Sequence, residues 1–263
     1  MDDLQWSVRD GVGTILLNRP QSRNAFTFAM IHEWERLLRA ARSDDDVRVI
    51  VLTGAGDLAF CSGVDLSAIS NANPDLTPLE RKQQLHAEIH RVALALEDLD
   101  KPVIASINGV AVGAGLDMAL MCDMRIMSTS ARVCEGYVKV GLTPGDGGAY
   151  YLPRIVGTAK ALELLLTGEF IDAQEALRIG LVNRIAAPEQ LAEETARFAR
   201  AIADHAPVTV RMIKRATYQS ANTDLRTALD LISSHFAVVA ATEDAVEALA
   251  AMKDKRTPHY RGR

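Results

Sequence analysis

The sequence predicts an α/β fold with an all-helical part at its C-terminal end, and three observations lead to this prediction. Continuous apolar runs at Val47–Thr53 and Pro102–Ile107 are typical of strands buried on both faces. Segments with helical periodicity, such as Phe28–Ala41, alternate with these runs, which indicates an α/β core. From about Pro188 onward, only helical patterns remain.

The N-terminal elements follow from local signals. The stretches Trp6–Val8 and Val12–Leu17 flank Asp10-Gly11, a turn pair that predicts a hairpin. Thr27 stands directly before the helical pattern of Phe28–Ala41 and is a candidate N-cap. The first buried strand then ends in Gly-Ala-Gly-Asp, which places a turn at its carboxyl end.

The remaining elements continue the alternation. We expect a mobile loop at Ser70–Pro78 and an amphipathic helix at Leu79–Leu99. A buried helix is expected at Val112–Met121 and a further strand at Arg125–Ser128. Four further helices are expected at Glu189–Asp204, Val208–Ser220, Asp224–Val239 and Glu243–Met252. This division predicts a core over residues 1–200 and a helical region over residues 201–263.

Composition and charge exclude several classes of protein. The 263 residues are 48% hydrophobic, enough for a sizeable core, and the net charge of −5 argues against a general nucleic-acid-binding surface. The cysteines lack CxxC spacing and read as buried free thiols at Cys61, Cys122 and Cys134. The acidic N-terminus has no apolar signal region, so we expect a cytoplasmic protein. Pro102–Cys122 could pass a membrane-span filter, but its Gly, Pro and polar residues favour a buried strand and helix.

Two glycine-flanked segments are the candidates for an active site. The first, Ala59-Phe60-Cys61-Ser62-Gly63-Val64-Asp65-Leu66, follows a buried strand, where small residues let a ligand approach the backbone. The second, Asn108-Gly109-Val110-Ala111-Val112-Gly113-Ala114-Gly115-Leu116-Asp117, enters a helix through small residues, so its unpaired N–H groups could face developing negative charge. A Rossmann-type phosphate loop is the alternative, but neither segment completes GxGxxG.

Together with Arg19-Pro20, Arg23-Asn24-Ala25 and Pro144-Gly145-Asp146-Gly147-Gly148, these segments resemble the signature of the crotonase superfamily, the enoyl-CoA hydratases and isomerases. The resemblance covers nearly the whole chain. It implies a crotonase-like ββα spiral core with a helical C-terminal trimerisation part. It also implies an oxyanion hole made by the backbone N–H groups of Val64 and Ala114, which would bind the oxygen of a thioester enolate.

The candidate proton-transfer groups depart from the family pattern. Asp117 shares a helix face with Ala114 and takes either a catalytic or water-holding role or a structural one. The resemblance places the second Glu of the hydratases at Tyr137, which could donate a hydrogen bond or simply line the pocket. Asp146 is the substitute acid–base candidate, or else the N-cap of the helix beginning at Gly147. Glu135 is expected to face elsewhere.

The resemblance further implies a site for the CoA part of the substrate. Its residues would be Arg23, Ala25, Ser62 and Asp65, completed by Phe236 and Lys255 of a neighbouring subunit in a homotrimer or a hexamer of two trimers. Without the resemblance, the sequence around Asp65 and Asp123 indicates turn or cap residues. On the same basis Phe236 would be a core residue and Lys255 a solvent-exposed charge. We expect no cofactor beyond the coenzyme A of the substrate. We also expect no metal, because the histidines are scattered and His86/His90 lack an HExxH pattern.

The leading hypothesis is therefore an enoyl-CoA hydratase or double-bond isomerase, and the missing second Glu favours isomerisation. Hydrolysis, dehalogenation or decarboxylation of another acyl-CoA would use the same oxyanion hole. A non-catalytic CoA-binding or RNA-associated scaffold is the alternative of a different class. We expect the partners to be an acyl-CoA thioester and other copies of the chain, with neither nucleic acid nor membrane.

Overall fold

A computed structural model describes residues 2–65 and 76–263, and in these ranges the strands form two sheets. The larger, six-stranded sheet has the order β1 (Leu4–Arg9), β2 (Val12–Leu17), β3 (Val49–Gly54), β5 (Val103–Ile107), β7 (Met124–Ser128) and β10 (Arg184–Ala186). The smaller sheet has the order β4 (Ala59–Cys61), β6 (Val110–Val112), β8 (Arg132–Cys134) and β9 (Ile171–Asp172). β1 and β2 form the predicted antiparallel hairpin, and β2, β3, β5, β7 and β10 run parallel.

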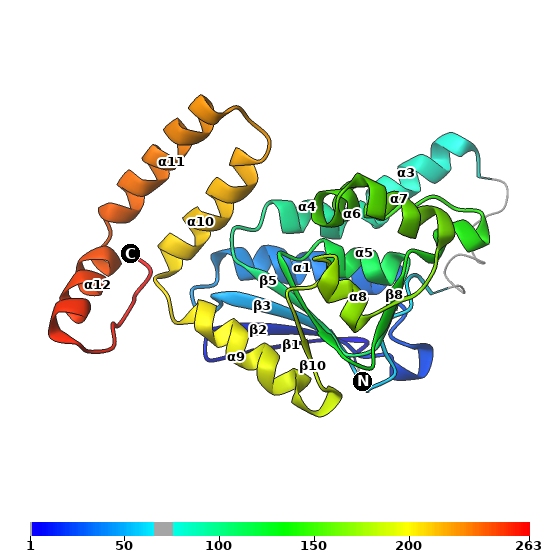
Figure 1. Cartoon of the computed structure of the whole chain (residues 1–263), viewed down its shortest axis with the longest axis horizontal. Coiled ribbons are helices and arrows are strands. Elements are labelled where there is room, and N and C mark those ends of the chain that lie inside the picture. Colours follow the sequence, from blue (N-terminus) through cyan, green and yellow to red (C-terminus); the bar gives the residue numbers. More distant parts are fainter. Residues whose placement is uncertain (1, 66–75) are drawn as a thin grey trace.

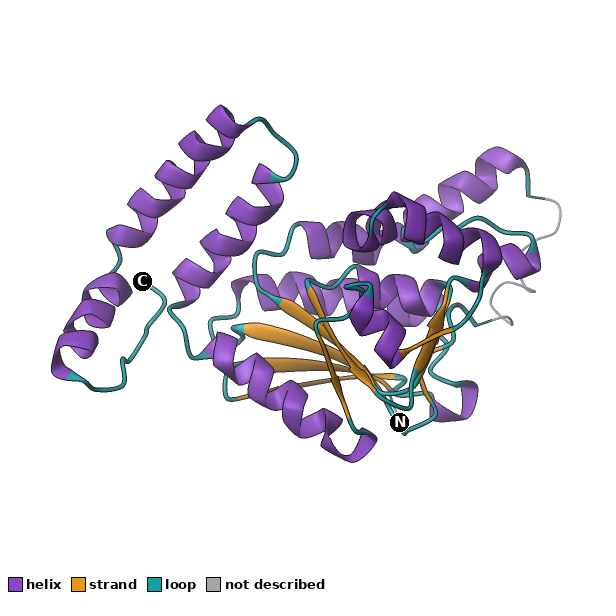
Figure 2. Cartoon of the chain, viewed as in Figure 1, coloured by secondary structure: helices purple, strands orange, loops and turns teal. Residues whose placement is uncertain are grey.

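The chain winds through the two sheets as a spiral of ββα turns. β3, β5 and β7 of the larger sheet are each followed by a short strand of the smaller sheet, namely β4, β6 and β8, before helices lead back. The strands β4, β6 and β8 pair in parallel, so successive turns of the spiral stack on one another. This arrangement confirms the predicted ββα spiral core, and Figure 2 shows its strands enclosed between helices.

Helices cover the sheets on both sides (Figure 1). The α-helices of the core are α1 (Phe28–Ser43), α3 (Pro78–Glu88), α4 (His90–Glu97), α5 (Ala114–Leu120), α6 (Gly148–Val156), α7 (Thr158–Thr167), α8 (Ala173–Arg178) and α9 (Leu191–Ala203). Three short 3-10 helices are described: η1 (Pro20–Ser22), η2 (Gly136–Val140) and η3 (Pro188–Gln190). The Thr27 hydroxyl accepts a hydrogen bond from the Met30 N–H, which confirms the predicted N-cap of α1.

The larger sheet separates two apolar cores, which explains the uninterrupted apolar sequence of its central strands. Along β3, Val49 and Val51 face α9, whereas Ile50 and Leu52 face the main core with α1, α4 and α5. Because side chains alternate between the faces of a strand, burial on both faces requires an apolar residue at every position.

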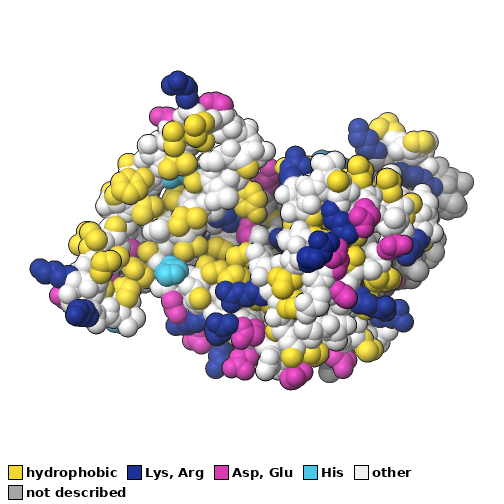
Figure 3. Space-filling view, viewed as in Figure 1, with side chains coloured by type: hydrophobic (Ala, Val, Ile, Leu, Met, Phe, Trp, Pro, Cys, Tyr) yellow, Lys and Arg dark blue, Asp and Glu magenta, His cyan; other side chains and the backbone are white. Residues whose placement is uncertain are grey.

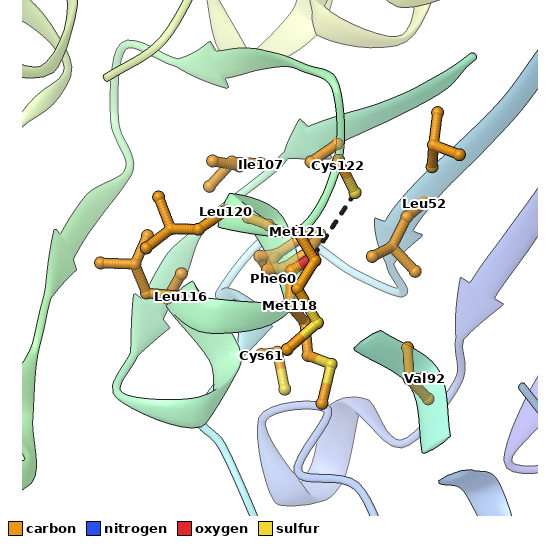
Figure 4. Close-up of a cluster of buried hydrophobic side chains, with 14 of the residues drawn as sticks. Leu52, Phe60, Cys61, Val92, Ile107, Leu116, Met118, Leu120, Met121 and Cys122 are labelled. Carbon is orange, nitrogen blue, oxygen red and sulfur yellow. Dashed lines mark hydrogen bonds between the residues drawn. The ribbon is translucent and has the colours of Figure 1, made fainter. Parts of the chain in front are cut away.

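Helix α5 lies deep in the main core. Figure 4 shows its Leu116, Met118 and Leu120 among buried side chains of neighbouring elements, labelled Leu52, Phe60, Ile107 and Val92. All of its residues from Ala114 to Leu120 are buried. Asp117 on this helix therefore has no access to bulk water and depends on partners inside the protein.

The helices α10 (Pro207–Ser220), α11 (Leu225–Ala240) and α12 (Glu243–Asp254) extend away from the core as an arm (Figure 1). Asp123 anchors the arm, because its carboxylate accepts hydrogen bonds from Lys214 Nζ at 2.8 Å and Tyr218 Oη at 2.8 Å. The same carboxylate also accepts the Val103 N–H at 2.7 Å, which agrees with the structural role predicted for Asp123. Among the described helices, none is long and apolar enough to cross a bilayer.

Three predicted elements differ in detail. The single helix expected over Leu79–Leu99 is two helices, α3 and α4, separated at Ile89. The buried helix begins at Ala114 and not at Val112, because Val110–Val112 forms β6, which is too short to show a strand period in the sequence. Most of the loop expected at Ser70–Pro78 lies outside the described residues, and Pro78 already belongs to α3. The boundary between residues 200 and 201 stays a prediction.

Candidate active site

The two glycine-flanked segments lie side by side. Gly63 and Gly113 both adopt positive φ, at 98° and 50°, which only glycine does at low cost. A β-carbon on Gly63 would lie 3.7 Å from the Ala114 nitrogen, and one on Gly115 would overlap the Cys61 carbonyl. The glycines therefore allow the start of α5 to approach the backbone that follows β4.

The backbone geometry leaves the amides of these segments available. Val64 forms a parallel bridge with Phe26, in which the Phe26 N–H donates to the Gly63 carbonyl and the Asp65 N–H to the Phe26 carbonyl. In such a bridge the N–H of Val64 itself points away from Phe26. Ala114 is the first residue of α5, so its N–H has no acceptor within the helix.

Four acidic side chains from three segments meet beside α5. Tyr137 of η2 places its hydroxyl 2.7 Å from Asp117 Oδ2 and 2.5 Å from Asp146 Oδ2. Glu135, just before η2, is only 1% exposed. A β-carbon on Gly148 would overlap Asp117 Oδ1 and lie 3.0 Å and 3.1 Å from the Glu135 oxygens, so both carboxyl groups face the start of α6.

Counting hydrogens limits the charge of this cluster. The phenol of Tyr137 has one hydrogen, yet its oxygen contacts a carboxyl oxygen on either side. One contact must use the phenolic hydrogen, and the other must use a hydrogen carried by a carboxyl group. In this geometry Asp117 and Asp146 therefore carry at most one negative charge between them.

The electrostatic environment favours protonated acids. Burial raises the pKa of Asp117 to about 7, and the hydrogen bond from Tyr137 partly opposes this rise. Burial, followed by the charge of Asp117, raises the pKa of Glu135 to about 10. Burial also raises the pKa of Asp146, and the hydrogen bond from Tyr137 opposes it. Acids held near neutrality can both give and take protons.

The structure bears on three predictions about this cluster. Glu135 does not face elsewhere: it is buried against Asp117, because the chain turns inward between β8 and η2. Its position at the carboxyl end of a buried strand was the sequence signal that could have placed it here. Asp146 is not the N-cap of α6, since Gly147 occupies that position without a side-chain cap. Tyr137 makes the hydrogen bonds considered possible for it.

The residues expected to hold CoA fall into two groups. The Ser62 N–H donates to the Arg23 carbonyl at 3.0 Å, and Arg19 joins the group by contacting Asp65 at 2.6 Å and the Ala25 carbonyl at 2.8 Å. Phe236 and Lys255 instead lie on the arm, exposed to solvent, and the chain does not bring them to its own carboxyl cluster (Figure 1).

The buried thiols do not supply a nucleophile. Burial raises the pKa of Cys61 to about 12, which leaves it a neutral thiol beside the start of α5. Over the described part of the chain there is no group of three His, Cys, Asp or Glu side chains arranged to hold a metal ion.

A ββα spiral with protonatable acids buried beside a helix N-terminus is typical of an enzyme that transfers protons. Comparisons with known proteins identify the family. The sequence model of the enoyl-CoA hydratase/isomerase family matches residues 7–263. A short-chain-enoyl-CoA hydratase of Clostridium acetobutylicum is 38% identical over 93% of this chain and 92% of its own length. A crotonyl-CoA hydratase of Syntrophomonas wolfei is 34% identical over 95% and 94% of the two chains.

The solved structures agree. The crystal structure of an enoyl-CoA hydratase from Bacillus anthracis superposes with a TM-score of 0.94 at 34% identity, covering 100% of both chains. The chain belongs to the enoyl-CoA hydratase/isomerase family, and the crotonase resemblance is confirmed.

Proposed function

We propose that this enzyme moves the double bond of an enoyl-CoA thioester by transferring a proton between the α and γ carbons. In this proposal the amides of Val64 and Ala114 bind the thioester oxygen, and Asp146 exchanges the proton. The adjacency of Gly63 and Ala114, the outward direction of the Val64 N–H and the position of Ala114 at the start of α5 support the first assignment.

One observation carries the choice of reaction. Asp117 Oδ2 contacts Tyr137, and the remaining oxygen of Asp117 faces Glu135, so both oxygens of Asp117 have acidic neighbours. Asp146 uses Oδ2 for Tyr137, whereas no described donor reaches its buried Oδ1. Asp117 Oδ1 and the two oxygens of Glu135 also lack a described donor, but they lie against each other, which leaves Asp146 Oδ1 as the oxygen outside that contact. We assign the substrate proton to this oxygen, since a single acid–base group is sufficient for a double-bond shift.

The steps of the double-bond shift balance within the site. Asp146 Oδ1 accepts a proton from the α carbon of a 3-enoyl thioester, and the electron pair of the C–H bond moves onto the thioester oxygen. The two backbone N–H groups stabilise this enolate. The same proton then returns to the γ carbon, the electrons move back, and a 2-enoyl thioester leaves. The reaction needs no cofactor besides the CoA of the substrate.

Hydration is the second candidate, because the relatives described above are named as hydratases. Hydration of a 2-enoyl thioester adds hydroxide at the β carbon and a proton at the α carbon. It therefore needs a group that holds water in addition to the proton donor. Asp117 would have to serve as that group in place of the Glu residues of the hydratases.

A substrate series distinguishes the reactions. Purified protein would be incubated separately with crotonyl-CoA, 3-hexenoyl-CoA and 3-chloropropionyl-CoA. The products would be separated by liquid chromatography against authentic 2-enoyl and 3-enoyl standards, because the isomers have equal mass, and then analysed by mass spectrometry. We expect 3-hexenoyl-CoA to become 2-hexenoyl-CoA, without addition of water, and crotonyl-CoA to be hydrated much more slowly. Rapid hydration of crotonyl-CoA without any isomerisation would favour the second candidate, and loss of chloride would favour dehalogenation. Tight CoA binding without turnover would favour the scaffold.

We also propose that the active protein is a trimer or a hexamer in which the arm contacts a neighbouring core. Apolar side chains on one helix of the arm are largely exposed in the single chain, among them Leu225, Leu229 and Phe236 at 72%, 52% and 72%. Figure 3 shows hydrophobic atoms gathered over the arm. Such a surface is typical of an interface, and assembly would bring Phe236 and Lys255 to the CoA of another subunit.

Light scattering after size exclusion tests the assembly. We expect a mass of three or six chains for the unchanged protein and a smaller species for Leu229→Glu, which places a charge on the apolar face of α11. Glu163→Gln, which changes an exposed residue of α7 outside the arm, is the control and should keep the mass of the unchanged protein. A monomer for the unchanged protein at micromolar concentration would contradict the proposal.

A further inference from the structure

We propose that Glu135 is a positioning residue: it remains a neutral carboxylic acid, donates its hydrogen to Asp117 Oδ1, and so holds the negative charge of the cluster on Asp117. This inference deepens the proposed function and rests on it for the catalytic consequence. Glu135 itself would not touch the substrate.

The surroundings of Glu135 leave it one stabilising arrangement. Both of its carboxyl oxygens are buried, and no donor in the described ranges reaches them. No described Lys or Arg side chain contributes to stabilising the charge of Glu135, Asp117 or Asp146. A buried carboxylate without a donor or a cation is costly, whereas a carboxylic acid can satisfy itself by donating to a neighbour. Asp117 is that neighbour.

The start of α6 favours the same distribution of charge. Gly148 is the first residue of α6, and its missing side chain lets Asp117 and Glu135 lie against the helix. The Gly148 N–H favours the charged form of Asp117. With Glu135 and Tyr137 both donating to it, Asp117 would have two side-chain donors where Asp146 has one, which favours placing the charge on Asp117.

The titratable neighbours of the cluster are few. Those that act on its carboxyl groups, or are acted on by them, come from β4, α4, α5, β8, η2, the loop before α6, and α6 itself: Cys61, His90, Asp117, Cys134, Tyr137, Asp146 and Tyr151. His90 Nε2 lies 2.9 Å from the Gly145 carbonyl, and its positive charge when protonated would favour the charged form of Asp146.

This arrangement forms a proton relay in which every hydrogen is accounted for. With the charge on Asp117, the phenol of Tyr137 donates to Asp117, and Asp146 carries a hydrogen that it donates to Tyr137. When Asp146 Oδ1 accepts the substrate proton, the hydrogen on Oδ2 passes to Tyr137, and the phenolic hydrogen passes to Asp117. The negative charge thereby leaves Asp117 and appears on the enolate, and the return step reverses each transfer.

The pH dependence of kcat/KM in two variants tests this role. Glu135→Leu keeps the side-chain size but removes the donor, so the pKa of Asp117 rises and the acid limb of the profile should move up by about one to two pH units. Glu135→Gln keeps a donor that cannot ionise, so its acid limb should stay near that of the unchanged enzyme. Any alkaline limb due to loss of the Glu135 proton should disappear in Glu135→Gln. Glu163→Gln, on the exposed face of α7, is the control.

An acid limb that does not move in Glu135→Leu, or that moves equally in Glu135→Gln, would overturn the proposal. If Glu135→Leu does not fold, carbon-13 NMR of glutamate side chains in the otherwise unchanged protein gives a second test. The signal absent from Glu135→Gln should have the chemical shift of a neutral acid at pH 7, and a carboxylate shift would refute the proposal. This measurement does not depend on turnover, so it separates a failure of this inference from a failure of the proposed reaction.

Discussion

Replacing Asp146 by Asn is expected to lower kcat/KM by about 10³-fold, within the range that acid–base groups contribute. The Asn side chain keeps the size of Asp and can still hydrogen-bond Tyr137, but it cannot accept a proton from the substrate. Because Asp146 is 4% exposed and burial raises its pKa, the substitution removes a carboxyl group that is costly to bury in its charged form and should not destabilise the fold. Steady-state kinetics on the enoyl-CoA that the enzyme turns over best would measure the loss.

Asp98→Asn is a matched control for this experiment, since Asp98 is exposed at the end of α4, away from the cluster. Asp117→Asn should also lower the rate, because it removes the inner end of the relay, and the double variant should be inactive. Full activity in Asp146→Asn would exclude Asp146 as the proton-transfer group and direct attention to Asp117.

The second large effect is expected at the Ala114 amide. Incorporating lactic acid in place of Ala114 exchanges its N–H for an ester oxygen and leaves the side chain unchanged. Loss of one oxyanion donor typically lowers kcat by about 10² to 10³-fold, because the enolate charge then lacks a preorganised hydrogen-bond donor. No intrahelical hydrogen bond is lost, since Ala114 is the first residue of α5.

Ala159 provides the control, because it is an exposed residue in the first turn of α7 and its N–H also has no intrahelical acceptor. An ester at position 159 should leave the kinetics unchanged. Substrate binding in the ester at position 114 should weaken much less than turnover, because the thioester carbonyl of the substrate carries less charge than the enolate. Equal turnover of the two esters would disprove the role of the Ala114 amide.

Local patterns in the sequence were sufficient for most of the fold. The apolar run of β3, the cap at Thr27 before α1, and the four C-terminal helices were all predicted, because periodicity and capping depend on residues close together in the chain. The ββα spiral was predicted from the resemblance of the sequence to the crotonase superfamily. The strand β6 was missed, since its three residues pair only with strands that are distant in the sequence.

For the site, the sequence alone determined the components: small residues around Val64 and Ala114, and acidic candidates at Asp117 and Asp146. It could not choose between a helix cap and a catalytic group for Asp146, and it assigned Glu135 to the wrong surroundings. Only the tertiary structure excluded the cap role of Asp146 and placed Glu135 beside Asp117, because it folds η2 and the start of α6 against α5. Whether a carboxyl group is charged depends on its burial and on the donors around it, and segments far apart in the chain provide both.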